Sequence, residues 1–166
     1  MKIKVKLTVD DYWNYDKYMV THTFSFFVKI LISLGIIPVA IFVTTTSMGL
    51  SILKVLIATL LGGLIFDFGF LYFAKRRMAK LLINSSGYIA EHSFEIFNEG
   101  LKRTIPAGGA IVKWSTITSI VQNRKYIYYF INKTNPLILP KRGFEREEEA
   151  IQFYNKSVEA WSKFKK

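Results

Sequence analysis

The sequence predicts a membrane protein of α+β fold, in which a two-helix transmembrane hairpin carries a small antiparallel β-barrel or sheet capped by a C-terminal helix. Apolar residues concentrate between Phe24 and Phe73, short strand-like patterns follow from Gly87 onward, and an amphipathic helical pattern closes the chain. With 166 residues, the chain has room for one small soluble domain beside the hairpin.

The first segment, residues 1–23, is expected to form a short strand and a helix at the membrane interface. Residues 2–7 alternate between lysine and an apolar residue, which is typical of a strand with one buried face. The run Thr8-Val9-Asp10-Asp11 then resembles a helix start, with acidic residues in the first turn. The aromatic residues of this helix suit either the membrane interface or a core-facing stripe. They are Tyr12, Trp13, Tyr15 and Tyr18.

Residues 24–83 are expected to form two transmembrane helices and a cytoplasmic extension of the second. The spans, about 24–46 and 55–74, each reach the roughly twenty apolar residues that cross a bilayer. The helical pattern continues to Ile83 and ends at a polar run that begins with Asn84. Two buried helices of a soluble protein are the alternative, but the rest of the chain is too small to cover them.

The distribution of charge predicts a multi-pass protein of the cell membrane with both termini in the cytoplasm. The chain has a net charge of +11, and the short loop between the spans carries a single lysine, Lys54. The outer flanks are strongly basic, and cytoplasmic flanks collect such residues. These residues are Lys2, Lys4, Lys6, Lys17, Lys75, Arg76, Arg77 and Lys80.

Polar and small residues inside the spans suggest internal packing. Lys29 and Asp67 are expected to lie at a similar depth and to form an intramembrane polar pair, although an acid within a span can also serve transport. Ala58 and Gly62 form a small-residue patch that allows close helix approach. This patch suits packing against the first span or association into a homo-oligomer.

Residues 84–166 predict a cytoplasmic domain of short strands with one C-terminal helix. Acidic residues crowd the start of that helix, and Ile151, Tyr154, Val158 and Trp161 form its apolar face. This order is found in pleckstrin-homology-like domains, where the helix plugs one end of a bent barrel. The expected strands are residues 88–97, 101–106, 110–114, 117–122, 126–132 and 137–139, with a hairpin turn at 107–109.

Local motifs in this order make the chain resemble the YcxB-like proteins of bacteria. The motifs are the Thr8-x-x-Asp11-Tyr12 helix start, Asn98-Glu99-Gly100, Lys113-Trp114-Ser115-x-Ile117 and Ile138-Leu139-Pro140-Lys141-Arg142-x-Phe144. The resemblance implies a two-span protein with a pleckstrin-homology-like C-terminal domain. It implies no biochemical activity.

Basic residues at strand ends are the candidate contacts for anionic lipid or a protein partner. They are Lys102, Arg103, Lys141 and Arg142. Near an anionic surface each would gain about 1 kcal/mol. Nucleic acid is not expected as a partner, because Tyr126, Tyr128 and Tyr129 suit a strand better than a base-stacking surface.

No catalytic residue, cofactor or metal site is expected. The chain has no Cys, and His22 and His92 lack partners at metal-ligand spacing. Glu91 is adjacent to His92, but neighbouring residues of a strand point to opposite faces. We therefore expect a non-catalytic membrane-anchored binding or scaffolding module. The alternative is a small membrane sensor or transport accessory subunit that uses Asp67.

Overall fold

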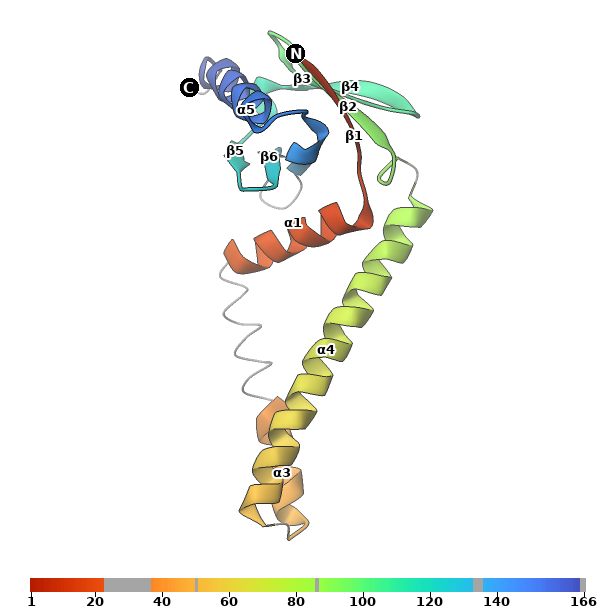
Figure 1. The fold of residues 1–166 in the computed structure, drawn as a ribbon, viewed down its shortest axis with the longest axis vertical. Helices are drawn as coiled ribbons and strands as arrows, with labels where there is room; N and C mark the ends of the chain where they lie inside the picture. The colour runs from red at the N-terminus through yellow and green to blue at the C-terminus, as the bar shows by residue number, and fades with distance from the viewer. Residues whose placement is uncertain (23–36, 50, 86, 133–135, 165–166) are drawn as a thin grey trace. The chain divides into compact units, whose positions relative to one another are not determined.

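The computed structural model describes residues 1–22, 37–49, 51–85, 87–132 and 136–164 as an α+β fold with two antiparallel sheets (Figure 1). The chain divides into two compact units. One contains residues 1–15 and 81–166, and the other contains residues 16–80.

The first sheet has the strand order β1-β2-β3-β4. Its strands are β1 (Lys2–Lys6), β2 (Glu91–Ile96), β3 (Gly100–Ile105) and β4 (Gly108–Lys113). Each adjacent pair is antiparallel, with Lys4 opposite Ser93 and Leu101 opposite Val112. The sequence predicts β1 as part of a separate N-terminal segment, residues 1–23. The structure instead makes it the outer strand of this sheet, in the same compact unit as residues 81–166.

The second sheet has the order β5-β6-β7. Its strands are β5 (Ser119–Gln122), β6 (Tyr126–Phe130) and β7 (Pro136–Pro140), and two short 3-10 turns, η2 (Trp114–Thr116) and η3 (Lys141–Gly143), flank it. The predicted strands are found, but several bounds differ by a few residues. The turn before β4 lies at residues 106–107, so Gly108 and Gly109 belong to the strand.

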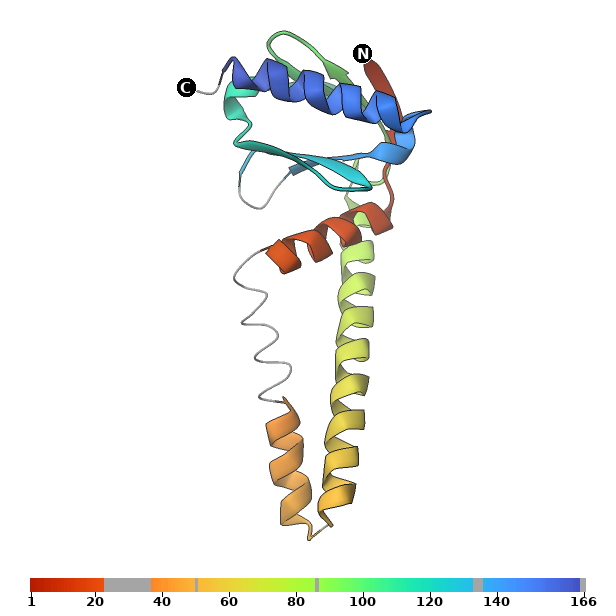
Figure 2. The same ribbon diagram turned by 60° about the vertical axis from the view of Figure 1, so that its left-hand side comes forward.

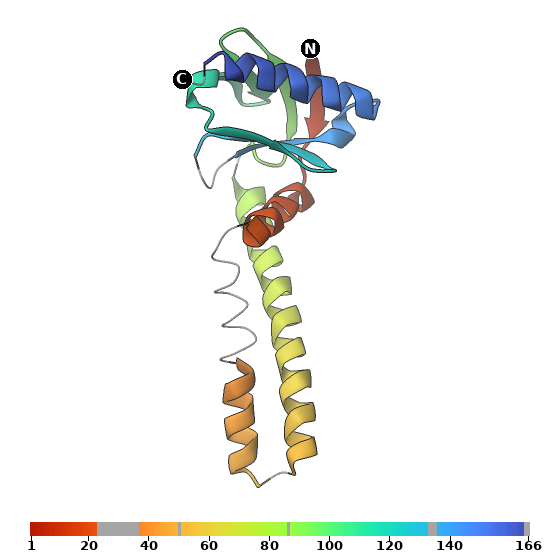
Figure 3. The ribbon, with the colours of Figure 1, turned by 90° about the vertical axis from the view of Figure 1, so that its left-hand side faces the viewer.

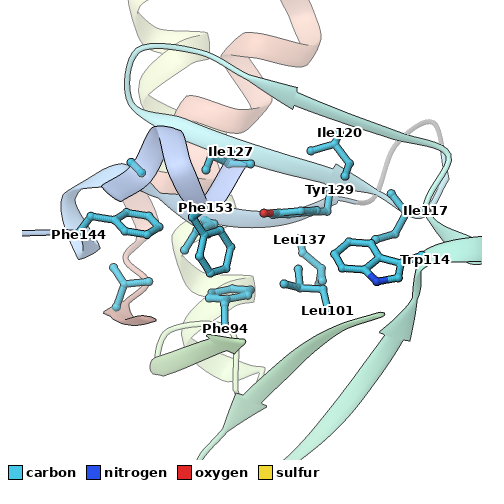
Figure 4. Packing of buried hydrophobic residues seen from close by; sticks show 13 residues of the cluster. Phe94, Leu101, Trp114, Ile117, Ile120, Ile127, Tyr129, Leu137, Phe144 and Phe153 are labelled. Carbon is cyan, nitrogen blue, oxygen red and sulfur yellow. The ribbon is translucent and has the colours of Figure 1, made fainter. Parts of the chain in front are cut away.

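The hydrophobic core lies between the two sheets and α5 (Glu147–Ser162). Phe94, Leu101, Trp114, Tyr129 and Phe153 are among its fully buried side chains, and Figure 4 shows them converging. The helix begins at three glutamates, as predicted from the preference of acids for a helix start.

The start of α1 (Val9–His22) covers the other face of the second sheet. Tyr15 packs on Tyr128 and Phe130, with ring centroids 5.7 and 6.4 Å apart. All five residues of β6 are buried, because alternate side chains face the core and α1. Figures 2 and 3 show the start of α1 and α5 on opposite sides of this sheet. For Tyr15, the core-facing alternative is therefore the correct one.

The second unit contains α3 (Ile37–Ser47) and most of α4 (Ile52–Asn84). The two helices lie side by side in Figures 2 and 3. A Cβ built on Gly62 would lie 2.9 Å from Ile41 Cδ1, so the absent side chain permits close packing. Among the described residues, α4 is the one helix long and apolar enough to cross a membrane. The N-terminal part of the first predicted span, residues 24–36, lies outside the described residues.

Candidate binding surface

A buried ion pair joins the start of α1 to the 3-10 turn after β7. Asp11 is 1% exposed, and its carboxylate accepts hydrogen bonds from both terminal nitrogens of Arg142, at 2.5 and 2.7 Å. Arg142 Nη2 also donates to the carbonyl oxygen of Lys6 at the end of β1 (2.9 Å). Such a two-point contact fixes orientation as well as charge. Arg142, predicted as a lipid or partner contact, therefore has a structural partner, although its side chain is 48% exposed.

The remaining bonds to Asp11 come from its own helix start and from the second sheet. The backbone N–H and the hydroxyl of Thr8 donate to Asp11 Oδ2 at 2.8 and 3.0 Å, which confirms the predicted helix start. Tyr126 donates its hydroxyl to Asp11 Oδ1 (3.1 Å) and accepts from Asn14 Nδ2 (2.9 Å). This network links β1, α1, β6 and the turn after β7.

The pKa of Asp11 lies below its ordinary value. Burial alone would raise this pKa, but the hydrogen bonds from Arg142 and Thr8, together with the Arg142 charge, outweigh it. The folded state therefore holds Asp11 ionised, and its contribution to stability is present above the unfolded-state pKa.

A second buried polar contact holds Arg103, another of the predicted contact residues. His92 is fully buried on β2, and its Nδ1 accepts from Arg103 Nε at 3.1 Å. Because guanidinium can only donate, the other ring nitrogen carries the proton and donates to the carbonyl of Gly87 (2.9 Å). Burial, with the Arg103 charge added, lowers the pKa of His92 to about 4. Glu91 is exposed while His92 is buried, which confirms that they occupy opposite faces.

Lys102 and Lys141 contact uncharged groups. The Lys102 ammonium lies 5.6 Å from the centroid of the Phe97 ring. Lys141 Nζ donates to Gln122 Oε1 at 2.8 Å. Of the four predicted contact residues, Arg142 is exposed, whereas Lys102, Arg103 and Lys141 are half-buried.

An open hollow of about 450 Å³ lies at the turn between β2 and β3. Its lining is Ile96, Phe97, Asn98, Glu99 and Ile111. Phe97 and Ile111 are 40% and 46% exposed. This hollow could not be predicted from the sequence, because Ile111 lies on a different strand from the other four residues and only the strand register brings it close.

The predicted polar pair in the spans joins Lys29 and Asp67. Lys29 lies outside the described residues, as does the side chain of Asp67, whose backbone belongs to α4. Within the described part of the chain, no group of three or more acidic or histidine side chains could hold a metal ion.

Comparison with known proteins supports the resemblance drawn from the motifs. Residues 96–156 match the family model described as YcxB-like protein. This segment is YcxB-like. The match runs from the end of β2 into α5 and includes Lys113–Ile117 and Ile138–Phe144, the two longer motifs. No curated protein and no solved structure gives a significant match to the chain.

Replacing Asp11 with Asn should destabilise the folded domain by about 1–3 kcal/mol, because the half-exposed Arg142 loses its buried counter-charge. Urea unfolding of the full chain in detergent, followed by tryptophan fluorescence, measures this, since all three tryptophans belong to the domain. Glu159→Gln, which removes an exposed ion pair to Lys163, is the control and should change little. The difference between wild type and Asp11→Asn should shrink as the pH falls below about 4. A difference that stays constant would contradict the assignment.

Replacing His92 with Gln should remove one source of acid sensitivity. The pKa of His92 falls from 6.5 to about 4 on folding, so between these values the unfolded chain binds a proton that the folded chain does not. Wild-type stability should therefore fall by about 2–3 kcal/mol more than that of His92→Gln between pH 7 and 4. Parallel pH profiles in the same unfolding assay would show that His92 is not held neutral.

Proposed function

We propose that this chain is a non-catalytic, membrane-anchored binding or scaffolding module. The observation that carries the proposal is that β1, before the apolar segment, and the strands after it belong to one folded unit. A domain closed by both flanks of an apolar segment is well suited to hold a binding surface at the bilayer.

The assembly of that domain favours an even number of membrane crossings. Helix α4 has 33 residues and is therefore about 50 Å long, more than the roughly 30 Å of a hydrocarbon core. Only 6% of its apolar window is buried, whereas a helix in a soluble core would be mostly buried. If α4 were the single crossing, β1 and β2 would lie on opposite sides of the membrane and could not pair. A second crossing before α4, at the predicted span 24–46, removes this conflict.

The polar residues of α3 are compatible with an apolar surrounding. The hydroxyls of Thr44, Thr45 and Thr46 donate to carbonyl oxygens of their own helix at 2.7–3.2 Å, and Ser47 does the same at 2.7 Å. Hydroxyls satisfied in this way need no water. These bonds support the proposal that α3 is the end of the first span.

The proposed orientation places the folded domain in the cytoplasm. The α4 end that leads into the domain carries Lys75, Arg76, Arg77 and Lys80, whereas the opposite end carries Lys54. The positive-inside rule then places both termini on the cytoplasmic side of the cell membrane.

The arrangement of strands supports a pleckstrin-homology-like domain, a class that often serves binding. Four strands and three strands form two antiparallel sheets, and an amphipathic helix follows them. Among the described residues, every buried side-chain nitrogen and oxygen has a hydrogen-bond partner, so the polar groups of Asp11, His92 and Ser157 are satisfied within the fold. We propose that Lys102 and Lys141 supply surface charge for a protein partner or anionic lipid, and that Arg103 and Arg142 add to it from their structural positions.

The topology can be measured with single cysteines, because the natural chain has none. Lys54 and Glu148 are both exposed and give the variants Lys54→Cys and Glu148→Cys. In intact cells, a membrane-impermeant maleimide should label the first and should label the second only after lysis. Labelling of both sites under the same condition would contradict the hairpin.

The alternative function, a sensor or transport accessory subunit, depends on Asp67. It predicts proton or ion flux into proteoliposomes containing the full chain, and loss of that flux in Asp67→Asn. A scaffold predicts no flux above that of empty liposomes for either protein. Flux abolished by the substitution would replace the scaffolding proposal.

A further inference from the structure

The outer edge of β4 is an unpaired strand edge among the described residues. β4 ends the strand order of its sheet, and Gly108–Ile111 are exposed. The N–H of Trp114 donates to the Glu99 carbonyl on the β3 side (3.1 Å). Since successive residues of a strand alternate, Val112 and Ala110 also face β3, and the backbone groups of Ile111 and Gly109 face outward.

The opposite edge of the same sheet is protected. Arg142 donates to the carbonyl of Lys6 on β1, and Gly143 lies against Val5. β1 also carries a lysine at every second position, which discourages pairing with another strand. In contrast, β4 has the sequence Gly-Gly-Ala-Ile-Val-Lys, with no proline and a single charge at its end. β4 therefore lacks the usual protection against an added strand.

The hollow beside this edge can take an apolar side chain. Ile111 belongs both to β4 and to the lining of the hollow, where Phe97 is the other large exposed apolar residue. A strand added along β4 would thus have backbone pairing on one side and an apolar contact nearby. Strand-addition sites combine these two elements, one for affinity and one for specificity.

The charges around the edge favour an acidic occupant. Lys102 lies opposite Ile111 in the strand register, and Lys113 ends β4. Glu99 in the lining of the hollow and Glu95 opposite Lys102 have the opposite charge. The same face carries Lys2, Lys4 and Lys6 on β1, at the other edge of the sheet, where Glu91 lies opposite Lys6 and 4.0 Å from Lys4. Across the whole face, lysines outnumber glutamates. The chain as a whole has a net charge of +11. A second copy of such a basic chain is a poorer electrostatic match than an acidic segment.

We propose that β4 binds an extended acidic segment of a partner protein, which adds a fifth strand to the sheet and places one apolar side chain in the hollow. This inference rests on the binding role proposed above and names its surface and the chemistry of its partner.

The test uses the full chain in detergent and a fluorescent peptide of alternating Asp and Val. Two further probes are the same peptide with alternate backbone nitrogens methylated and a peptide of alternating Lys and Val. The variant Ile111→Pro removes the outward N–H, a change that an edge strand tolerates. Ile111→Ala is its matched control, because it shortens the same side chain and keeps the N–H.

The Asp-Val peptide should bind, and Ile111→Pro should weaken binding about tenfold relative to Ile111→Ala, since one backbone hydrogen bond is lost. The methylated peptide should bind the unaltered protein at least about tenfold more weakly than the Asp-Val peptide. This comparison tests the backbone pairing even if tryptophan fluorescence shows that Ile111→Pro is misfolded. No binding of the Asp-Val peptide, equal binding of its methylated form, or preference for the Lys-Val peptide would overturn the proposal.

Two outcomes would assign the edge differently. A dimer of the full chain that Ile111→Pro dissociates in the absence of peptide would make a second copy the occupant and overturn the proposal. A partner crosslinked to the full chain in membranes and captured equally by Ile111→Pro would remove β4 from the interaction. The scaffolding function would survive that second result, so the two proposals fail separately.

Discussion

The pairing of β1 with β2 is the constraint on which the rest of this structure depends. It joins strands that precede and follow the whole apolar segment, with Lys4 opposite Ser93. Asp11 and Arg142 reinforce the same joint, since Arg142 also bonds to the carbonyl at the end of β1. The domain can therefore form only when residues 1–15 and 81–166 lie on the same side of any membrane that the segment between them enters.

Two of the basic residues have structural contacts, one of them at this joint. An arginine can hold a buried carboxylate and a carbonyl at once because its donors have a fixed planar geometry. Arg142 uses this geometry on Asp11 and Lys6, and Arg103 contacts the buried ring of His92. The available backbone belongs to β4, at the far edge of the sheet from the joint.

Much of the local structure could be predicted from the sequence, because it depends on neighbouring residues. Thr8 and Asp11 begin α1, and three glutamates begin α5. The helical pattern that ends near Ile83 corresponds to α4, which ends at Asn84. The pairing of β1 could not be predicted in this way, because alternation identifies a strand and not its partner. For the same reason, a basic residue such as Arg142 looks like a surface charge until the fold places Asp11 beside it.

The most direct test of this account is a disulfide between β1 and β2 in membranes. Lys4 and Ser93 lie opposite each other. Because Leu7 donates to the carbonyl of Ala90 and hydrogen-bonded pairs alternate along antiparallel strands, Lys4 and Ser93 form a pair without mutual backbone hydrogen bonds. The Cα atoms of such a pair lie close enough for a disulfide. The chain has no natural cysteine to compete. Mild oxidation of isolated membranes should crosslink Lys4→Cys/Ser93→Cys within one chain, and should not crosslink the mismatched pair Lys4→Cys/Thr104→Cys. Absence of the first crosslink, or equal formation of both, would contradict a domain closed across the apolar segment.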